Sequence, residues 1–220
     1  LFRSELSVRM GIQVARVDMA VTRRDQEGMD LDFSVADKSI EKFASRGLKI
    51  DLHLFVPYGA GHGPILPKYA DVPLDKVALY PITEKAYRHY IRETVKRYGK
   101  HARFIQIRNE PANKHQYLGT SDEFADEIRI AREEIKKLYP NMPVTNGGYC
   151  NVDPEMQECV KKIKGYTDFV SYHWHGDLPG MKQFFKQISD IHDDANYDNP
   201  AYANTEMGYY MPNAGGERIN

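Results

Sequence analysis

The chain has 220 residues, of which 41% are hydrophobic and 28% charged, so it can bury a core and does not have the composition of a disordered segment. Its 30 basic and 31 acidic side chains are well mixed and give a net charge of -1, which argues against a nucleic acid or an anionic membrane as a partner. No run approaches about 18 consecutive apolar residues, so we expect no membrane span. The length favours a single domain over residues 1–220.

Neither the first residues nor the cysteines fix the cellular compartment. Residues 1–6 lack the long apolar stretch of a signal peptide, but cleavage removes such a segment, and we expect a secreted or periplasmic protein rather than a cytoplasmic one. Cys150 and Cys159 are too few for a disulfide scaffold, and Cys159 falls on the apolar side of a predicted helix. We therefore expect two ordinary buried thiols rather than a bridge.

Strand and helix patterns alternate along the whole chain, beginning with an expected helix over residues 2–10. Six short, partly apolar runs bounded by Gly, Pro, Asn or Asp have the composition of strands. They cover residues 12–19, 48–55, 104–109, 142–146, 169–173 and 201–205. Apolar residues at helical spacing predict further helices between these strands, and a Thr120-x-x-Glu123 capping box precedes one of them. These helices lie around residues 36–43, 87–98, 124–138, 153–163 and 181–188.

Regular alternation of strands and helices is typical of a parallel sheet covered by helices, either a closed barrel or an open, doubly wound sheet. The segment 57–81 is rich in Gly and Pro, and we expect it to be a long loop without regular structure. Six strands are two fewer than a (β/α)8 TIM barrel contains. Because the sequence opens on a helix and stops soon after the sixth strand, we expect an incomplete barrel that lacks one strand at each end. Such a piece exposes two unpaired sheet edges.

Two of the predicted strands finish on a glutamate. Glu110 directly follows the strand over 104–109, and Glu206 directly follows the strand over 201–205. A carboxylate is costly to hold at the end of a buried strand unless it is paired or takes part in chemistry. Cleavage of a glycosidic bond needs two carboxyl groups, one as proton donor and one as nucleophile or base. The pattern therefore predicts a glycosidase.

A strand followed by Asn109-Glu110-Pro111, a long amphipathic helix and a later strand ending in Glu206 resembles the retaining glycoside hydrolases of clan A. The strand Gly11-Ile12-x-Val14-x-Arg16-Val17-Asp18 is most similar to glycoside hydrolase family 39 and its relatives. The resemblance implies a TIM barrel of which this chain supplies strands 2 to 7. It also implies cleavage of β-glycosidic bonds with retention, with Glu110 as acid/base on the fourth strand and Glu206 as nucleophile on the seventh.

The resemblance assigns further roles around the two glutamates. Asn109 would hydrogen-bond the sugar hydroxyl beside the reacting carbon. Arg16, pointing into the barrel from the second strand, would keep Glu206 ionised through its positive charge. Glu110 must start the reaction protonated while Glu206 is ionised, so we expect their environments to separate the two pKa values.

Histidines and aromatic residues also fall at strand ends. In the resembling family, a histidine and an aromatic hydroxyl of the sixth strand orient the nucleophile; His173 fits the first position, whereas His175 stands where tyrosine is usual. Trp174 either stacks on a sugar ring or belongs to the core, and His53 either lines the mouth of the barrel or is structural. Tyrosines just past strand ends suit sugar recognition, because each offers an apolar face and a hydroxyl. They are Tyr58, Tyr149, Tyr209 and Tyr210.

Two alternative functions remain open at the level of the sequence. His53, His173 and His175 with a carboxylate are a candidate ligand set for a metal-dependent barrel hydrolase. Alternatively, the barrel binds carbohydrate without cleaving it. Under the glycosidase interpretation we expect a carbohydrate substrate and no cofactor or metal, and a chain that lacks outer strands is expected to be inactive by itself. The sequence leaves open the sugar, the linkage, exo or endo action and the oligomeric state.

Overall fold

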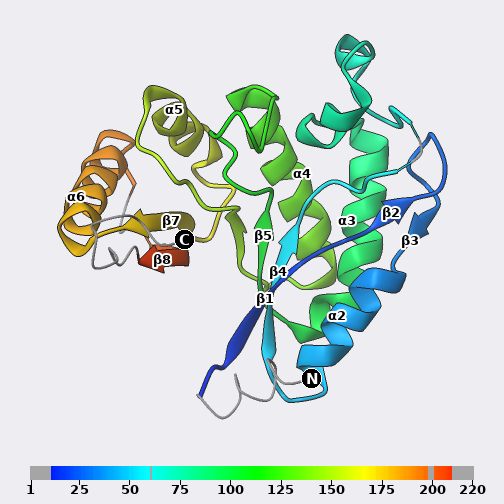
Figure 1. Ribbon diagram of the computed structural model, residues 1–220, viewed down its shortest axis with the longest axis horizontal. Helices are drawn as coiled ribbons and strands as arrows, with labels where there is room; N and C mark the ends of the chain where they lie inside the picture. The colour runs from blue at the N-terminus through cyan, green and yellow to red at the C-terminus, as the bar shows by residue number, and fades with distance from the viewer. Residues whose placement is uncertain (1–10, 60, 198–200, 210–220) are drawn as a thin grey trace, which may run out of the picture.

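The computed structural model describes residues 11–59, 61–197 and 201–209, with side chains up to residue 207 (Figure 1). The helix expected over residues 2–10 lies outside this range. The parallel strands are β1 (Val14–Asp18), β4 (Lys49–Leu54), β5 (Ala102–Ile107), β6 (Val144–Asn146), β7 (Val170–Gly176) and β8 (Tyr202–Tyr209). The α-helices are α2 (Ser34–Ala44), α3 (Glu84–Tyr98), α4 (Ser121–Leu138), α5 (Pro154–Ile163) and α6 (Leu178–Asp194).

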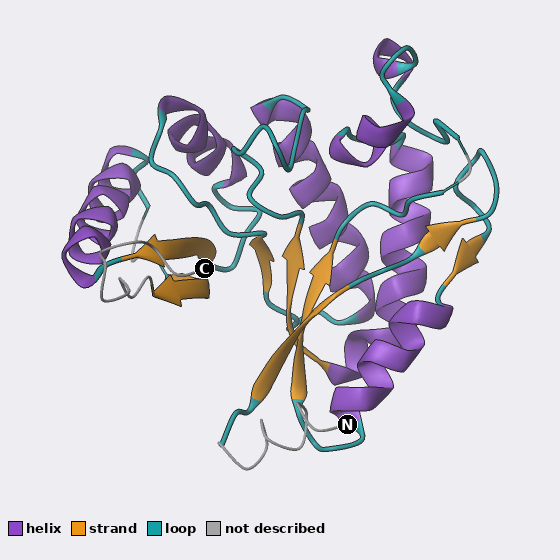
Figure 2. Cartoon of the chain, viewed as in Figure 1, coloured by secondary structure: helices purple, strands orange, loops and turns teal. Residues whose placement is uncertain are grey.

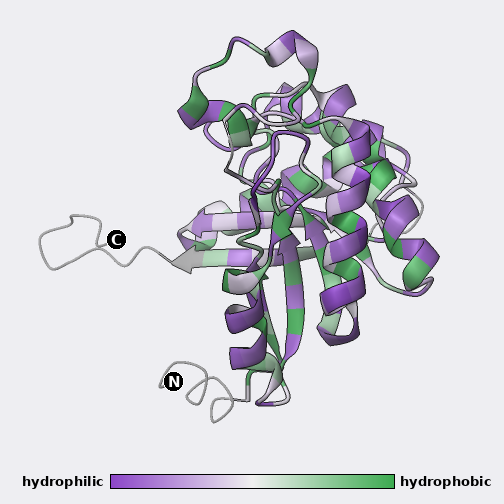
Figure 3. Cartoon of the chain, turned by 90° about the vertical axis from the view of Figure 1, so that its right-hand side faces the viewer, coloured by the Kyte–Doolittle hydropathy of each residue, from purple (hydrophilic) through white to green (hydrophobic). Residues whose placement is uncertain are grey.

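The strands and helices alternate as the sequence predicts. β1, β4, β5 and β6 form a parallel sheet in that order, and β7 pairs in parallel with β8. Figures 1 and 2 show α2 to α6 following one another around the outside of the strands. Figure 3 shows apolar segments along the central strands and polar residues on the outer turns of the helices. None of the described helices is both long enough and apolar enough to cross a membrane.

Side chains join the two groups of strands where the backbone ladder is interrupted between β6 and β7. Asn146 Nδ2 donates to the carbonyl of Ser171 at 2.9 Å, and Asn146 Oδ1 accepts from Ser171 N at 2.8 Å. Thr145 Oγ1 donates to the carbonyl of Phe169 at 2.7 Å. Asn146, Thr145 and Ser171 are buried, and these side-chain bonds add to a backbone bond from Tyr149 N to the carbonyl of Ser171 at 3.1 Å. β7 and β8 therefore continue the curved row of parallel strands.

Side chains cap the starts of α4 and α5, the first of them by the capping box expected from the sequence. Thr120 Oγ1 accepts from Glu123 N at 3.2 Å, and Glu123 Oε2 accepts from Thr120 N at 2.8 Å, which is the expected capping box of α4. Asp153 Oδ1 accepts from Met156 N at 2.8 Å at the start of α5. Both cysteines are free thiols as expected; Cys159 is buried on α5, whereas Cys150, also expected to be buried, is only partly so.

Two features of the fold differ from the expectation. The segment 57–81 was expected to lack regular structure, but it contains two 3₁₀ helices, η1 (Pro67–Tyr69) and η2 (Leu74–Leu79). Prolines stand at the starts of both, because their fixed φ suits the first turn of a helix. The chain also forms a small antiparallel pair, β2 (Thr22–Arg23) with β3 (Leu31–Asp32). Strands of two residues are too short to show a period in the sequence.

A buried ion pair ties the end of β5 to α4. Arg108 Nε donates to Glu127 Oε2 at 2.9 Å, and Arg108 Nη2 donates to Glu127 Oε1 at 2.7 Å. Two further guanidinium hydrogens bind the carbonyls of Ala78 and Tyr80, each at 2.9 Å. The two side chains are 3% and 5% exposed. This pair fixes the backbone immediately before Asn109 and Glu110.

We expect Glu127→Ala to lower the free energy of unfolding by about 3–5 kcal/mol, because it leaves the Arg108 charge buried without a counterion. Urea denaturation monitored by circular dichroism measures this loss. Asp126→Ala is the matched control on the same helix; its carboxylate is 65% exposed, so the expected loss is about 0–1 kcal/mol. Equal losses in the two variants would contradict the importance of the buried pair.

Candidate active site

The two glutamates singled out from the sequence converge on one imidazole. His173 Nδ1, on β7, lies 3.0 Å from Glu110 Oε1 and 3.8 Å from Glu206 Oε2. These two oxygens are therefore at most about 7 Å apart, the sum of the two distances. Catalytic carboxyl groups are separated by about 5–5.5 Å in retaining glycosidases and about 6.5–9.5 Å in inverting ones. This limit concerns one oxygen of each carboxylate, and it is compatible with both mechanisms.

Arg16 is the cation of the site. From β1 its Nη1 donates to Glu206 Oε2 at 2.7 Å, and its Nη2 donates to Asn109 Oδ1 at 3.1 Å. Its Nε donates to Asp18 Oδ1 at 3.1 Å. Each of the three guanidinium nitrogens therefore donates a hydrogen bond. Through Glu206, Arg16 connects the first and the last of the described parallel strands. This places Arg16 beside Glu206, where the sequence interpretation required it.

His53 lies behind the site, where it contacts Asp18 and the backbone of Arg108, and it does not line the mouth of the barrel. The ring is fully buried, with Nδ1 2.7 Å from Asp18 Oδ1 and Nε2 2.6 Å from the carbonyl of Arg108. Burial is the main cause that lowers the pKa of His53, the hydrogen bond with Asp18 opposes it, and the nearby charge of Arg16, whose Nε lies 3.2 Å from Nδ1, lowers it further. The hydrogen bond from His53 in turn lowers the pKa of Asp18 to about 2. The expectation that His53 binds substrate is wrong, because no part of its ring is accessible.

Glu110 is surrounded by hydrogen-bond donors. His173 Nδ1 faces Oε1, and Asn113 Nδ2 donates to Oε2 at 2.9 Å. The hydrogen bond with His173 is the main cause that lowers the pKa of Glu110 to about 2; burial opposes it, while Asn113 and the thiol of Cys150 act in the same direction. These donors therefore stabilise the ionised form of Glu110, whereas the sequence interpretation requires the protonated form at the start of the reaction.

The backbone around Glu110 is held in an uncommon conformation. Arg108 and Glu110 have φ angles of 62° and 42°, in the left-handed region that residues with a Cβ seldom adopt. Arg108 N donates to the carbonyl of Leu54 at 2.8 Å, and Glu110 N donates to the carbonyl of Gly147 at 3.1 Å. A Cβ at Gly147 would lie 1.4 Å from the carbonyl oxygen of Arg108, so only glycine fits there. These contacts direct the Glu110 carboxylate toward His173.

Side chains of β7 alternate between the site and the helix layer. His173 faces the glutamates, and His175 Nε2 lies 3.1 Å from Glu206 Oε1. Trp174 points the other way and packs on Phe184 of α6, with ring centroids 5.1 Å apart. Successive side chains of a strand lie on opposite faces, and β7 runs past all three residues to Gly176. The expectation that Trp174 binds sugar is therefore wrong; its indole belongs to the core side.

The tyrosines expected to recognise sugar are placed differently from one another. Tyr58 follows β4 with 44% of its surface exposed; burial of the remainder, and then the charge of nearby Asp18, raise its pKa. Tyr149 is fully buried against another tyrosine and does not face solvent, which corrects that expectation. The side chains of Tyr209 and Tyr210 lie outside the described residues.

Sequence reasoning missed three polar residues of the site. Asp18 lies two residues after Arg16 on β1, and the strand period alone places both on one face. Asp51 is buried on β4, two residues before His53, and burial raises its pKa to about 7. Asn113 lies in a turn after Glu110, where no periodic pattern marks it.

The alternative ligand set of three histidines does not assemble. Both ring nitrogens of His53 are bonded, to Asp18 and to the carbonyl of Arg108. In the part of the chain that the structure describes, no group of three or more His, Cys, Asp or Glu side chains is placed to hold a metal ion.

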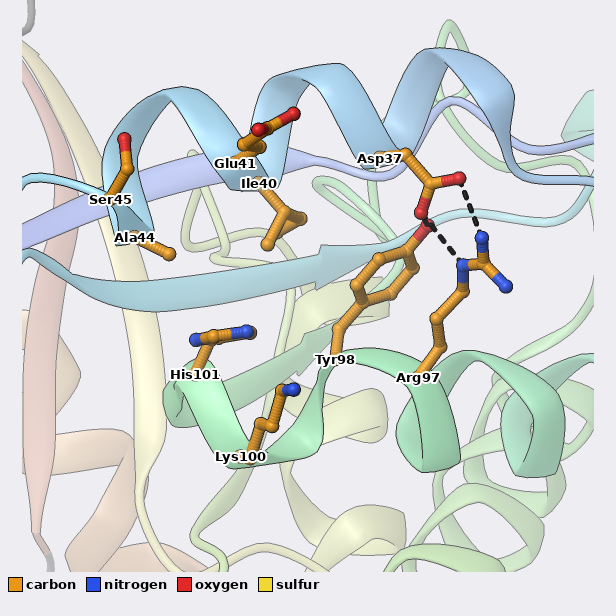
Figure 4. Close-up of a pocket in the computed structure, with 9 residues that line it drawn as sticks. All are labelled: Asp37, Ile40, Glu41, Ala44, Ser45, Arg97, Tyr98, Lys100 and His101. Carbon is orange, nitrogen blue, oxygen red and sulfur yellow. Dashed lines mark hydrogen bonds and ion pairs between the residues drawn. The ribbon is translucent and has the colours of Figure 1, made fainter.

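A groove of about 500 Å³ lies on the helix layer, away from the glutamates (Figure 4). It runs between α2 and the end of α3 with the following η3 (Gly99–His101). Two hydrogen bonds of 2.7 Å between Arg97 and Asp37 cross it, and Tyr98 also donates to Asp37 at 2.8 Å. None of the candidate site residues lines this groove, so it is separate from the active site.

Comparison with known proteins finds no family model and no curated protein that match the sequence. Solved structures do match the fold. A glucosidase from Croceicoccus marinus matches with a TM-score of 0.68 and 14% identity, over 99% of this chain and 49% of that chain. A GH39 β-xylosidase from Caulobacter crescentus matches with a TM-score of 0.68 and 15% identity, over 96% and 50%. The GH53 catalytic domain from Ignisphaera aggregans matches with a TM-score of 0.65 and 14% identity, over 97% and 64%.

The chain has the fold of glycoside hydrolase barrels. It spans about half the length of the first two of these structures, and its six parallel strands match part of a (β/α)8 barrel. The fold class expected from the sequence, an α/β TIM barrel represented by strands 2 to 7, is confirmed. At identities this low the likeness concerns the fold, and family 39 is one of several families that share it.

Proposed function

We propose that the protein is a retaining glycoside hydrolase that cleaves β-glycosidic bonds, with Glu110 as acid/base and Glu206 as nucleophile. The observation that carries the proposal is the shared contact of both carboxylates with His173 Nδ1, at 3.0 and 3.8 Å. The glycoside hydrolase fold supports it, since the likeness extends over nearly the whole chain. A carbohydrate substrate and a secreted or periplasmic location are parts of the same proposal.

In the first step, Glu206 attacks the anomeric carbon while Glu110 gives its proton to the departing glycosidic oxygen, which leaves a glycosyl-enzyme ester. Arg16 and His175 hold the two oxygens of Glu206, so the attacking carboxylate has a fixed orientation. In the second step, Glu110 removes a proton from water, which attacks the same carbon and releases Glu206. The ionised Glu110 of the structure is the form that this second step requires.

One observation favours a second candidate, a barrel that binds carbohydrate without cleaving it. The donors around Glu110 stabilise its ionised form, and an ionised carboxylate has no proton to give to a leaving group. The two candidates share the cleft and the contacts of Arg16, and they differ in turnover alone.

The deciding experiment incubates the complete protein with aryl β-glucoside, β-xyloside, β-mannoside and β-galactoside and follows the products by ¹H NMR. Release of the β anomer before mutarotation is expected. If the α anomer is the first product, the mechanism is inverting and the proposed retention is contradicted. Binding of the corresponding oligosaccharides by calorimetry without any release of product would support the second candidate instead.

Removal of the Arg16 charge should reduce the stabilisation of the transition state. We expect Arg16→Met to lower kcat/KM about 10- to 100-fold, as for the loss of a charged hydrogen bond worth about 1.5–3 kcal/mol. Arg16→Lys should fall between wild type and Arg16→Met, because lysine keeps the charge but not the fork that bridges Glu206 and Asn109. Arg103→Met, at an exposed arginine of β5, is the matched control. An unchanged kcat/KM in Arg16→Met would show that the Arg16 charge does not contribute to catalysis.

A further inference from the structure

Glu110 is held from two sides by residues of different elements. His173 reaches Oε1 from β7 at 3.0 Å, and Asn113 reaches Oε2 at 2.9 Å from the turn that follows β5. We propose that Asn113 is a positioning residue for Glu110. The Asn113 amide holds the second carboxylate oxygen of Glu110 and favours the ionised carboxylate, which is the form that acts as a base. The consequence for catalysis rests on the function proposed above.

The orientation of the Asn113 amide is determined by its other partner. Asn113 Oδ1 accepts from the backbone N–H of His115 at 3.0 Å, so the amide nitrogen is the end that faces Glu110. The backbone fixes the same turn, since Asn113 N donates to the carbonyl of Glu110 at 2.7 Å. The Asn113 carbonyl in turn accepts from Gln116 N and Tyr117 N at 2.8 and 2.9 Å. Asn113 is therefore placed as a donor before any substrate enters.

The thiol of Cys150 also lies beside the Glu110 carboxylate. Cys150 Sγ lies 3.9 Å from Asn113 Nδ2, and burial, together with the charge of Glu110, raises the pKa of Cys150 to about 12. The thiol therefore keeps its proton and acts as a further donor toward Glu110. The Asn113 amide N–H cannot accept a hydrogen bond from a neutral carboxyl group, and the thiol sulfur, which already receives the contact from Asn113 Nδ2, is only a weak acceptor.

The remaining neighbour, His173, also favours the ionised carboxylate. His173 Nε2 is buried against Gly148 and has no hydrogen-bond partner among the described residues, whereas Nδ1 faces Glu110. A proton on Nδ1 is used in a hydrogen bond, and a proton on Nε2 is not. Protonation of Glu110 therefore requires that a donor be lost or moved. Of the two nitrogen donors, His173 also lies 3.8 Å from Glu206, whereas Asn113 contacts Glu110 without that second role.

The test measures the pKa of Glu110 directly, by ¹³C NMR titration of the complete protein labelled at glutamate side-chain carboxyls. The resonance is assigned by its absence in Glu110→Gln. Asn113→Asp keeps the size of the side chain and an acceptor for His115 N, but it replaces the donor by a carboxylate oxygen. We expect the pKa of Glu110 to rise by at least about one unit in this variant, and by roughly one unit in Asn113→Ala.

Cys150→Ala should raise the same pKa by less, and Asn141→Ala, at an exposed asparagine outside the site, should leave it unchanged. If the Glu110 pKa in Asn113→Asp and Asn113→Ala equals that of wild type, the inference is overturned. The titration needs no substrate, so this outcome differs from failure of the proposed function, which shows as full activity in Glu110→Gln. In the active protein, the alkaline limb of kcat/KM should move to higher pH in Asn113→Ala by the same amount as the pKa.

Discussion

Replacing Glu206 with alanine should abolish turnover of an aryl β-glycoside, with a fall in kcat on the order of 10⁶-fold, the scale for loss of the nucleophile in a covalent hydrolase. The reason is the placement of this carboxylate. Arg16 Nη1 donates to its Oε2 at 2.7 Å, and His175 Nε2 lies 3.1 Å from its Oε1. Both oxygens are oriented, yet the side chain remains 41% exposed and open to a substrate. Steady-state kinetics measures the loss.

Azide separates loss of the nucleophile from loss of the fold. In Glu206→Ala the space left by the carboxylate admits azide, which attacks the anomeric carbon from the same side and gives an α-glycosyl azide, inverted relative to the substrate. Glu158→Ala is the matched control, because this glutamate lies on α5 with 52% of its side chain exposed; it should keep the wild-type kcat. Full residual activity in Glu206→Ala would rule this residue out as nucleophile.

The part of the site that the sequence could predict is the part that depends on strand ends. Arg16 and Glu206 lie on strands, and Glu110 follows one, and the place of each of these strands in the βα alternation is visible from the pattern. Parallel strands bring their carboxyl ends to one edge, so a correct strand order brings these residues together without knowledge of any contact. The ion pair between Arg16 and Glu206 spans nearly the whole chain and follows from that order.

The errors come from where strands stop and from what lies behind them. β7 was expected to end at His173, but it extends to Gly176, so the alternation of side chains turns Trp174 away from the site. β8 likewise runs to Tyr209, so Glu206 lies within the strand and not beyond it. His53 has the spacing of a mouth residue, yet the Asp18 carboxylate and the Arg108 carbonyl cover both of its nitrogens. Boundaries and long-range partners leave no local signal.

The protonation of Glu110 illustrates the same limit in electrostatic terms. The need for a proton donor follows from the chemistry, but the pKa follows from His173 and Cys150, which are distant in sequence, and from Asn113 in an irregular turn. The ionised Glu110 and the exposed Glu206 suit the second half of a retaining reaction. The first half requires a proton that the surrounding donors disfavour, so the reaction should be fastest in acidic solution.

Replacing Glu110 with alanine should lower kcat/KM about 10²–10⁴-fold for alkyl β-glycosides, whose leaving group needs a proton. A dinitrophenyl β-glycoside should lose much less, since dinitrophenolate departs without protonation and Glu206 is still present to attack. The glycosyl-enzyme then waits for water without a base, so a rapid release of dinitrophenol should precede a slow steady state. Stopped-flow absorbance measures both phases. A loss of equal size for both leaving groups would contradict the role of Glu110 as acid.

Azide and pH then assign the two carboxylates to opposite faces of the sugar. In Glu110→Ala, azide attacks the glycosyl-enzyme and should give a β-glycosyl azide, whereas Glu206→Ala should give the α product; the same anomer from both variants would contradict the proposed division of roles. Above the Glu110 pKa of about 2, the wild-type protein loses the proton that the leaving group needs, so kcat/KM for alkyl glycosides should fall as pH rises toward neutrality. Glu110→Ala has no such proton to lose, and its activity on the dinitrophenyl substrate should show no fall from that ionisation.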